Sequence, residues 1–254
     1  FPGDALISEE PRALQEQVID TAAMASRQFY GLELEPELYT PPDKSQLTWI
    51  MDPIDGTKGY LAGRYYAIAL ACFDGIEPFF ATIAVPASPP EGGDFSINGS
   101  LGFAVKGMGA WMGRVEHGKS VTFHRLNTLH AAKPGRLRLT MSLEHAGGLD
   151  VILKETLGAY DLIKMDSQAK YLAIAAGDLD VYLRRCRKDG SPDLTWDHLP
   201  GAMIAREAGC HVSHFTGKGI QFKVDSAVHF EGGIACCRPD VDIQLDNLVE
   251  NAFS

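Results

Sequence analysis

The chain has 254 residues, of which 45% are hydrophobic and 22% are charged, an ordinary composition for a soluble globular protein. Its formal net charge of -10 argues against non-specific nucleic-acid binding. No apolar run has the length of a membrane span and no secretory signal is visible, so we expect neither a membrane nor a nucleic-acid partner. The 5 cysteines include no CxxC pair, which indicates reduced thiols in a cytoplasmic protein.

In the first half of the chain, one helical pattern is followed by apolar runs that alternate with turn residues. The helical periodicity covers residues 11–29. The predicted strands lie at residues 47–51, 65–73, 79–85, 101–106 and 110–115. Asp74-Gly75 is typical of a hairpin turn between the strands at 65–73 and 79–85, and Gly107 and Gly109 predict a second hairpin between the strands at 101–106 and 110–115. The proline- and glycine-rich segment 86–99 predicts a loop.

The pattern changes after a predicted linker at residues 127–136. Strands are predicted at residues 138–141, 162–165, 181–183, 210–214 and 234–237. Helices are predicted at residues 149–157, 168–176, 199–208 and 239–252. A hairpin-rich first half and an alternating second half predict layered sheets covered by helices.

Two aspartates follow the apolar run Trp49-Ile50-Met51. Asp52 and Asp55 flank Pro53-Ile54. Because proline fixes its own φ and pushes the preceding residue out of the helical region, we expect a sharp turn at the strand end. Such a turn can aim both carboxylates and the Ile54 carbonyl at one point. Clustered carboxylates repel unless a cation joins them, and Mg²⁺ suits carboxylates, water and substrate phosphate.

The next residues extend this candidate site. Gly56 allows the backbone to approach a ligand closely. If a helical turn begins near Thr57, its N–H groups would face an anion. The Thr57 hydroxyl could orient a metal-bound water.

Each acidic stretch also has an ordinary structural interpretation. An Asp-Pro-x-Asp-Gly run is a common surface turn, although the apolar residues before Asp52 argue against it. Glu9 and Glu10 could form a solvated face. Asp197 is a natural N-cap for the helix predicted at 199–208, with Pro200 in its first turn.

Taken together, these stretches resemble a known pattern. The pair Glu9-Glu10, the run Asp-Pro-Ile-Asp-Gly-Thr at 52–57 and Trp196-Asp197 before a helix resemble the inositol monophosphatase superfamily of Mg²⁺-dependent, lithium-sensitive phosphatases. The resemblance implies an α/β (α+β) fold, a layered α-β-α-β-α sandwich of the inositol monophosphatase and fructose-1,6-bisphosphatase type. It also implies an N-terminal α+β metal-binding domain at residues 1–134 and a C-terminal α/β substrate-binding domain at residues 135–254.

Further stretches resemble the 3'(2'),5'-bisphosphate nucleotidase branch of that superfamily. They are Thr-Lys-Gly-Tyr at 57–60, Met-Asp-Ser-Gln-Ala-Lys-Tyr at 165–171 and Asp-Val-Tyr-Leu-Arg at 180–184. Ser167 and Lys170 lie three residues apart at a predicted helix start, so we expect them to share a face that suits a second phosphate.

Three substrate contacts have open alternatives or a loose basis in the sequence. Lys170 could instead be a solvated helix lysine. Arg184, at a strand end, could contact the nucleotide or cap the sheet. His145 lies near the place where relatives carry a histidine that contacts the base or a phosphate.

By resemblance, two or more Mg²⁺ ions would hold the scissile phosphate and lower the pKa of a bound water. The implied metal ligands are Glu9, Asp52, the Ile54 carbonyl, Asp55 and Asp197. The implied catalytic residues are Thr57, Glu9 and Asp52. The implied substrate-binding residues are Gly56, Thr57, His145, Ser167, Lys170, Arg184 and Asp197. The reaction would convert 3'-phosphoadenosine 5'-phosphate into AMP and phosphate.

The N-terminus departs from the family pattern. Relatives carry a helical segment upstream of the glutamate pair, whereas this sequence begins just before Glu9. We therefore expect a truncated helical layer: either the upstream residues are disordered or removed, or a second copy or another partner covers the gap. The alternative functions are an inositol phosphate phosphatase of the same superfamily and a truncated, non-catalytic or repurposed member that binds a nucleotide or a partner.

Overall fold

The computed structural model describes residues 5–8, 47–86, 93–116, 118–128, 136–141, 160–187, 189–224 and 227–241. The helices predicted at 11–29 and 149–157 and most of the helix predicted at 239–252 lie outside these ranges. The candidate site residues Glu9 and His145 also lie outside them.

The first half of the chain forms a sheet whose strands follow one another in chain order, from β1 to β7. The two predicted hairpins are confirmed, because β3 pairs with β4 and β5 pairs with β6, both antiparallel. β1, which was not predicted, adds to β2 as a parallel strand. The strand bounds are β1 Ala5–Ser8, β2 Leu47–Asp55, β3 Ala67–Asp74, β4 Glu77–Val85, β5 Ser100–Val105, β6 Gly109–Arg114 and β7 His124–Arg125.

The second half forms a mixed sheet with the strand order β12-β14-β10-β8-β9. β8 runs parallel to both β9 and β10, and β14 runs antiparallel to β10 and β12. The bounds are β8 Leu137–Met141, β9 Tyr160–Lys164, β10 Val181–Arg185, β12 His211–His214 and β14 Gly233–Cys237. A separate short ribbon pairs β11, Asp193–Leu194, with β13, Ala227–Val228.

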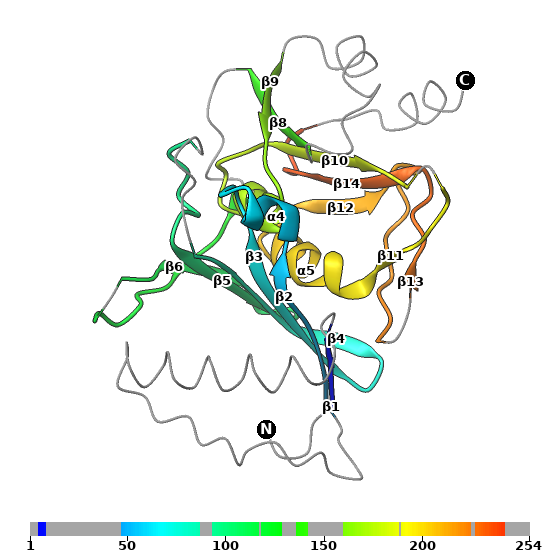
Figure 1. Cartoon of the computed structure of the whole chain (residues 1–254), viewed down its shortest axis with the longest axis horizontal. Helices are drawn as coiled ribbons and strands as arrows, with labels where there is room; N and C mark the ends of the chain where they lie inside the picture. The colour runs from blue at the N-terminus through cyan, green and yellow to red at the C-terminus, as the bar shows by residue number, and fades with distance from the viewer. Residues whose placement is uncertain are drawn as a thin grey trace.

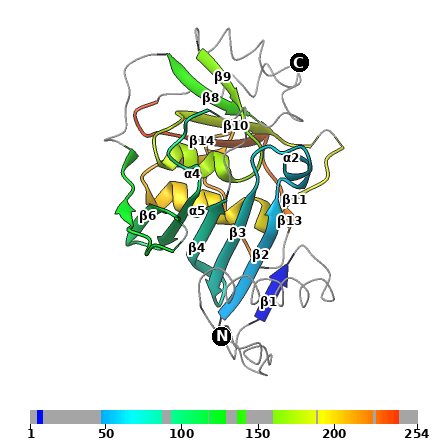
Figure 2. The same cartoon turned by 60° about the vertical axis from the view of Figure 1, so that its left-hand side comes forward.

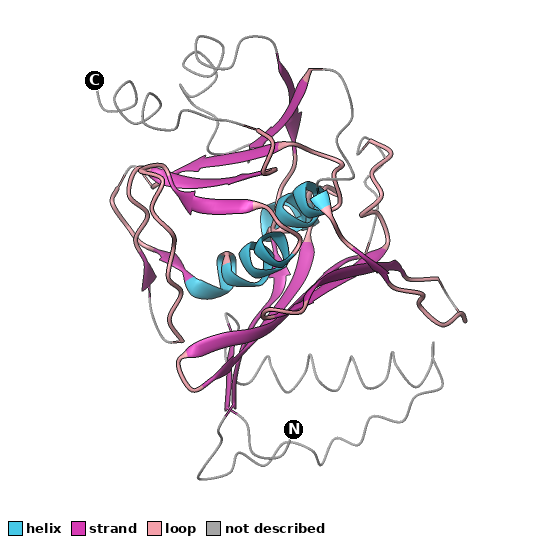
Figure 3. Cartoon of the chain, turned by 180° about the vertical axis from the view of Figure 1, so that it is seen from behind, coloured by secondary structure: helices cyan, strands magenta, loops and turns pink. Residues whose placement is uncertain are grey.

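Two helices fill the space between the sheets (Figures 1 and 3). They are α4, Ala169–Ala175, and α5, Leu199–Glu207, and a 3-10 turn η4, Thr195–Asp197, leads into α5. This sheet-helix-sheet order confirms the predicted α/β class, while the segments predicted as outer helices fall outside the described ranges. Within the described ranges, no helix has both the length and the apolar character needed to cross a membrane.

Small residues on the inner face of the first sheet allow the helices to approach closely. Ala67, Ala69 and Ala71 alternate along β3 with no exposed surface, as the two-residue period of a strand requires. On β5, a Cβ at Gly102 would lie 2.5 Å from the Leu172 Cδ1 of α4. One buried apolar cluster therefore spans both sheets and both helices. All strands of the first sheet precede the predicted domain boundary between residues 134 and 135, and all strands of the second sheet follow it. The division into two domains itself stays a prediction.

The opposite face of the first sheet carries a row of half-buried aromatic side chains. The ring centroids of Trp49 and Phe80 lie 6.1 Å apart, and those of Phe103 and Trp111 lie 5.2 Å apart. Phe103 on β5 and Trp111 on β6 are directly opposite each other, and such cross-strand pairs stabilise neighbouring strands, whereas Trp49 on β2 and Phe80 on β4 meet across β3. The covering partner expected for this region stays a prediction.

The crossing of α4 and α5 depends on a glycine, and we expect Gly201→Ala to destabilise the fold by about 1–3 kcal/mol. A Cβ at Gly201 would lie 2.4 Å from the Tyr171 Cδ2, and this ring is fully buried and cannot swing away. Gly219→Ala is the matched control, because a Cβ there meets nothing within 4 Å. Denaturant unfolding of both variants measures the difference, and equal midpoints would contradict the tight crossing.

Candidate active site

β2 carries the two-aspartate motif inside the strand rather than after it. The predicted strand ends at Met51, whereas the observed strand continues through Pro53 to Asp55. Asp52 pairs with Ala69 and Asp55 pairs with Ala67, so β2 advances by three residues where β3 advances by only two. This irregularity accommodates a proline that has no N–H to donate. A bulged strand thus replaces the sharp turn predicted at the strand end.

Asp52, Ile54 and Asp55 each have one oxygen atom with a defined hydrogen-bond partner. Asp52 is 2% exposed, and its Oδ1 accepts the Ile54 N–H at 3.1 Å. The Ile54 carbonyl accepts the Thr57 hydroxyl at 3.1 Å. The Asp55 carboxylate accepts the backbone N–H of Gln168 in a short contact. The motif is therefore tied both to itself and to the start of α4.

Gly56 joins this motif to the second half of the chain. Its φ of 84° is in the left-handed region, and a Cβ there would lie 3.0 Å from the Ser167 Cβ. A short helix α2, Thr57–Leu61, follows directly and begins where the sequence predicted (Figure 2). Only glycine combines this backbone conformation with such a close approach.

Ser167 and Lys170 both line a pocket next to the two-aspartate motif, which is described below. They do not share a helix face as predicted. α4 begins at Ala169, and Ser167 precedes it with a φ of 65°, which is unusual for a residue with a side chain. The Ser167 hydroxyl accepts the Ala169 N–H at 3.2 Å. Lys170 is only 3% exposed, so its alternative role as a solvated lysine is wrong.

Asp197 lies in η4, immediately before α5. Its Oδ2 accepts the Leu194 N–H at 3.3 Å and lies 3.8 Å from the Arg187 Nη2. His198 occupies the N-cap position of α5, so the alternative role of Asp197 as the cap of this helix is wrong. The carboxylate of Asp197 instead lines the pocket.

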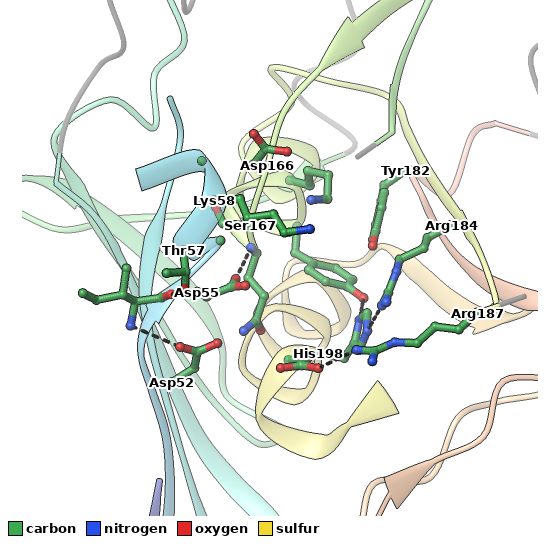
Figure 4. A pocket seen from close by; sticks show the side chains of 17 residues that line it. Asp52, Asp55, Thr57, Lys58, Asp166, Ser167, Tyr182, Arg184, Arg187 and His198 are labelled. Carbon is green, nitrogen blue, oxygen red and sulfur yellow. Dashed lines mark hydrogen bonds and ion pairs between the residues drawn. The ribbon is translucent and has the colours of Figure 1, made fainter. Parts of the chain in front are cut away.

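A pocket of about 290 Å³ brings these segments together, a volume that suits a small polar ligand. Figure 4 shows Asp52 and Asp55 on one side and Tyr182, Arg184 and Arg187 on the other. The predicted site residues that line this pocket are Asp52, Ile54, Asp55, Gly56, Thr57, Ser167, Lys170, Arg184 and Asp197. Asp52 and Asp55 thus face Arg184 and Arg187 across one cavity, whereas Asp197 lies beside Arg187.

The charges in the pocket perturb one another. Burial raises the pKa of the Asp55 carboxyl to about 6, and Asp197 adds to the rise, although Lys170 and the Gln168 N–H oppose it. Burial lowers the pKa of Lys170 to about 8, despite the opposing effect of Asp55 and Asp166. A buried carboxylate that is costly to ionise gains from a nearby cation.

The chemistry of the donor set fits a hard divalent cation. The pocket offers the carboxylates of Asp52, Asp55 and Asp197 and the carbonyl of Ile54, all of them oxygen ligands. Within the described ranges, however, no three Asp, Glu, His or Cys side chains lie close enough together to hold a metal ion. The parallel register places Ser8, the residue before Glu9, beside Met51, the residue before Asp52.

Several pocket residues were not predicted from the sequence. Tyr171 and Tyr182 lie within the quoted nucleotidase-like stretches, and His198 directly follows Asp197, so their positions beside motif residues were the available signal. Arg187 lies between β10 and β11 and carried no motif. Its position follows from the fold alone.

Comparisons with known proteins identify the family to which this chain is similar. The sequence profile described as the Inositol monophosphatase family matches residues 1–241. A 3'(2'),5'-bisphosphate nucleotidase of Schizosaccharomyces pombe is 33% identical over 192 residues, which are 73% of this chain and 54% of that protein. A 3'(2'),5'-bisphosphate nucleotidase of Oryza sativa is 31% identical over 216 residues, 81% of this chain and 59% of that protein. The chain thus spans little more than half the length of these relatives.

A solved structure shows the same fold. CysQ from Bacteroides thetaiotaomicron, described as a bacterial member of the inositol monophosphatase family, has a TM-score of 0.60 and 22% identity. The match covers 93% of this chain and 78% of that one. From the profile match over nearly its whole length, the chain belongs to the inositol monophosphatase family.

Proposed function

We propose that this chain is a Mg²⁺-dependent phosphomonoesterase that removes the 3'-phosphate of 3'-phosphoadenosine 5'-phosphate, giving AMP and phosphate. The family is in general metal dependent, and the relatives described above are named bisphosphate nucleotidases. The compartment in which it would act, predicted to be the cytoplasm, and its inhibition by lithium stay predictions.

This proposal rests on one observation: the same pocket is lined by three carboxylates and by several positively charged side chains, of which Lys170 and Arg184 are buried. Lys170 and Arg184 are 3% and 9% exposed, and Arg187 reaches toward Asp197. A substrate with one phosphate would need only the carboxylate side and its metal ions. The cations on the far side favour a substrate with a second anionic group, because guanidinium groups bind phosphate in a defined geometry.

The residues of the pocket have separate roles in this proposal. Asp52, Asp55, Asp197 and the Ile54 carbonyl would hold the metal ions, with Glu9 as the further ligand implied by resemblance. Bound Mg²⁺ supplies charge stabilisation for the phosphoryl group and a more acidic water. The Thr57 hydroxyl donates a hydrogen bond to the Ile54 carbonyl, so its oxygen lone pairs would accept a hydrogen bond from the attacking water and orient it. Gly56 keeps the backbone near Thr57 accessible to the phosphoryl oxygens.

Phosphate release from 3'-phosphoadenosine 5'-phosphate tests the proposal. We expect release that requires Mg²⁺, stops when the ion is chelated and returns when the ion is added back. Release at an undiminished rate in excess chelator would contradict the metal mechanism. Calorimetry of nucleotide binding beside the same assay identifies a non-catalytic member, which would bind the nucleotide without releasing phosphate.

A substrate panel separates the proposal from the inositol phosphate alternative. The panel contains 3'-phosphoadenosine 5'-phosphate, 3'-AMP and inositol monophosphate at the same Mg²⁺ concentration. We expect the highest kcat/KM for the bisphosphate, because it alone offers a second phosphate to Lys170, Arg184 and Arg187. A higher kcat/KM for inositol monophosphate would overturn the nucleotidase assignment and favour the alternative.

A further inference from the structure

Arg184 is held between two buried partners on the wall of the pocket. Its Nη1 contacts the His198 Nε2 at short range, and its Nη2 donates to the Asp193 Oδ1. Asp193 and His198 are each 2% exposed. With one partner at each terminal nitrogen, the plane of the guanidinium is fixed, and its other N–H groups are available to a ligand. Figure 4 shows the Arg184 and His198 side chains pointing toward one another, joined by a dashed line.

The partners of His198 determine where its ring proton lies. An arginine can only donate hydrogen bonds, so the His198 Nε2 must accept and cannot carry a proton. The other ring nitrogen, Nδ1, lies 2.8 Å from the Tyr171 hydroxyl oxygen. A neutral imidazole carries its single proton on the nitrogen that does not accept, here Nδ1. The His198 Nδ1–H therefore donates to the Tyr171 oxygen.

The hydrogen-bond role of the Tyr171 hydroxyl follows from that of His198. Because its oxygen accepts from His198, its own O–H proton is left to donate to another group. Tyr171 is 1% exposed, and it lines the pocket together with Arg184. A buried hydroxyl proton without an acceptor costs free energy, and an acceptor atom on a bound ligand would remove that cost.

We propose that His198 is a positioning residue, which locks Arg184 in place and turns the Tyr171 hydroxyl into a hydrogen-bond donor toward the nucleotide. This rests on the proposed function for the identity of the substrate. The Arg184 and Tyr171 donors then recognise acceptor atoms of the nucleotide away from the scissile phosphate. Asp193 also fixes this arrangement, because its Oδ1 accepts hydrogen bonds from the Arg184 Nη2 and, at 3.1 Å, from the Arg187 Nε.

Paired substitutions at His198 separate positioning from mere packing. His198→Gln places an amide oxygen near the former Nε2, where it can still accept from Arg184. His198→Asn is too short for that contact but keeps a polar group near the former Nδ1. We expect His198→Asn to raise KM for 3'-phosphoadenosine 5'-phosphate on the order of 10-fold with little change in kcat, and His198→Gln to restore most of the loss. Equal KM values for both variants and the wild type would overturn the proposal.

A small phosphomonoester without a nucleotide, such as inositol monophosphate, is the control substrate. It has no second phosphate and no base for Arg184 and Tyr171 to bind, so His198→Asn and Tyr171→Phe should lower kcat/KM for the bisphosphate by a clearly larger factor than kcat/KM for the small ester. The same proportional loss on both substrates would show a general structural defect and contradict a positioning role. Unfolding midpoints of the variants are measured alongside.

Nitrogen-15 NMR of histidine-labelled protein tests the tautomer without any turnover. The His198 signal is assigned by its disappearance in His198→Gln. We expect a protonated Nδ1 and an unprotonated Nε2, and a proton on Nε2 would overturn the proposal. If the wild type releases no phosphate from any substrate, the proposed function fails, while the NMR result and calorimetry of nucleotide binding to wild type and His198→Asn still decide the inference. Equal nucleotide affinities would then count against it.

Discussion

Replacing Asp52 by asparagine is expected to lower kcat/KM for phosphate release by at least about 100-fold, while the fold stays intact. Loss of a residue that merely supports a metal ligand typically costs about 10–100-fold in metal affinity or activity, and Asp52 is a proposed ligand itself. The asparagine keeps an oxygen that can accept the Ile54 N–H, which the Asp52 Oδ1 accepts at 3.1 Å. The change therefore removes charge and leaves the local hydrogen bond in place.

Asp74→Asn is the matched control for this experiment. Asp74 is an exposed aspartate at the end of β3, away from the pocket, so the same chemical change there should leave activity unchanged. Phosphate release over a range of Mg²⁺ concentrations and denaturant unfolding are measured for both variants. If Asp52→Asn retained wild-type kcat/KM at limiting Mg²⁺, the proposed role of this carboxylate would be wrong.

The largest effect on stability is expected at Asp180, the residue directly before β10 of the second sheet. Its Oδ1 accepts the Arg138 Nη2 and the Arg238 Nη1, both at 2.7 Å, and its Oδ2 accepts the Arg138 N–H at 2.7 Å. Asp180 and Arg238 are each 4% exposed. Removal of one partner from a buried ion pair costs about 3–5 kcal/mol, and we expect the lower end of this range because Arg238 keeps its hydrogen bonds to Asp240. We expect that loss in the free energy of unfolding of Asp180→Ala.

The exposed pair of Arg136 and Asp161 on the same sheet supplies the control. Their side chains are 60% and 57% exposed, and their closest atoms lie 3.4 Å apart. Surface pairs of this kind contribute about 0–1 kcal/mol, so Asp161→Ala should change the free energy of unfolding little. Similar losses for Asp180→Ala and Asp161→Ala would show that burial does not set the strength of the Asp180 cluster.

The effect of Asp180 has a defined pH dependence. Burial by itself would raise the pKa of its carboxyl, but the hydrogen bonds and charges of Arg138 and Arg238 outweigh it and leave the pKa below its ordinary value. A depressed folded-state pKa gives stability that is fully present above the unfolded pKa, about 3.9, and is lost as pH falls through the folded value. The difference between wild type and Asp180→Ala should therefore shrink below about pH 4.

The parts of the fold that could be predicted are those with a local signal. The hairpins β3–β4 and β5–β6 follow from apolar alternation and turn glycines, and α5 follows from its helical pattern after Trp196-Asp197. β1 could not be predicted, because a four-residue segment with three apolar residues becomes a strand only when β2 lies beside it. The continuation of β2 through Pro53 was missed because it depends on a bulge against β3, and a bulge is a property of the pair.

The same distinction holds for the candidate site. Asp52, Asp55 and Asp197 were found because short motifs carry them, and they do line one pocket. The network of Asp193, His198 and Tyr171 was not found, because each of these residues is ordinary in its own segment. They form a network only because the fold brings the start of α5, the body of α4 and the end of β10 together at Arg184. Polar side chains that become buried through tertiary contact leave no periodic signal in a sequence.

The central claim is that carboxylates from distant parts of the chain share divalent cations that bind a phosphoryl group. A crystal structure with Mn²⁺ in place of Mg²⁺, together with phosphate, tests it most directly through the anomalous signal of the metal. We expect Mn²⁺ in the pocket with ligands from Asp52, Asp55 and Asp197 and with a phosphate oxygen in its coordination shell. Mn²⁺ bound elsewhere, or phosphate held by Arg184 and Lys170 with no metal beside the aspartates, would contradict the account.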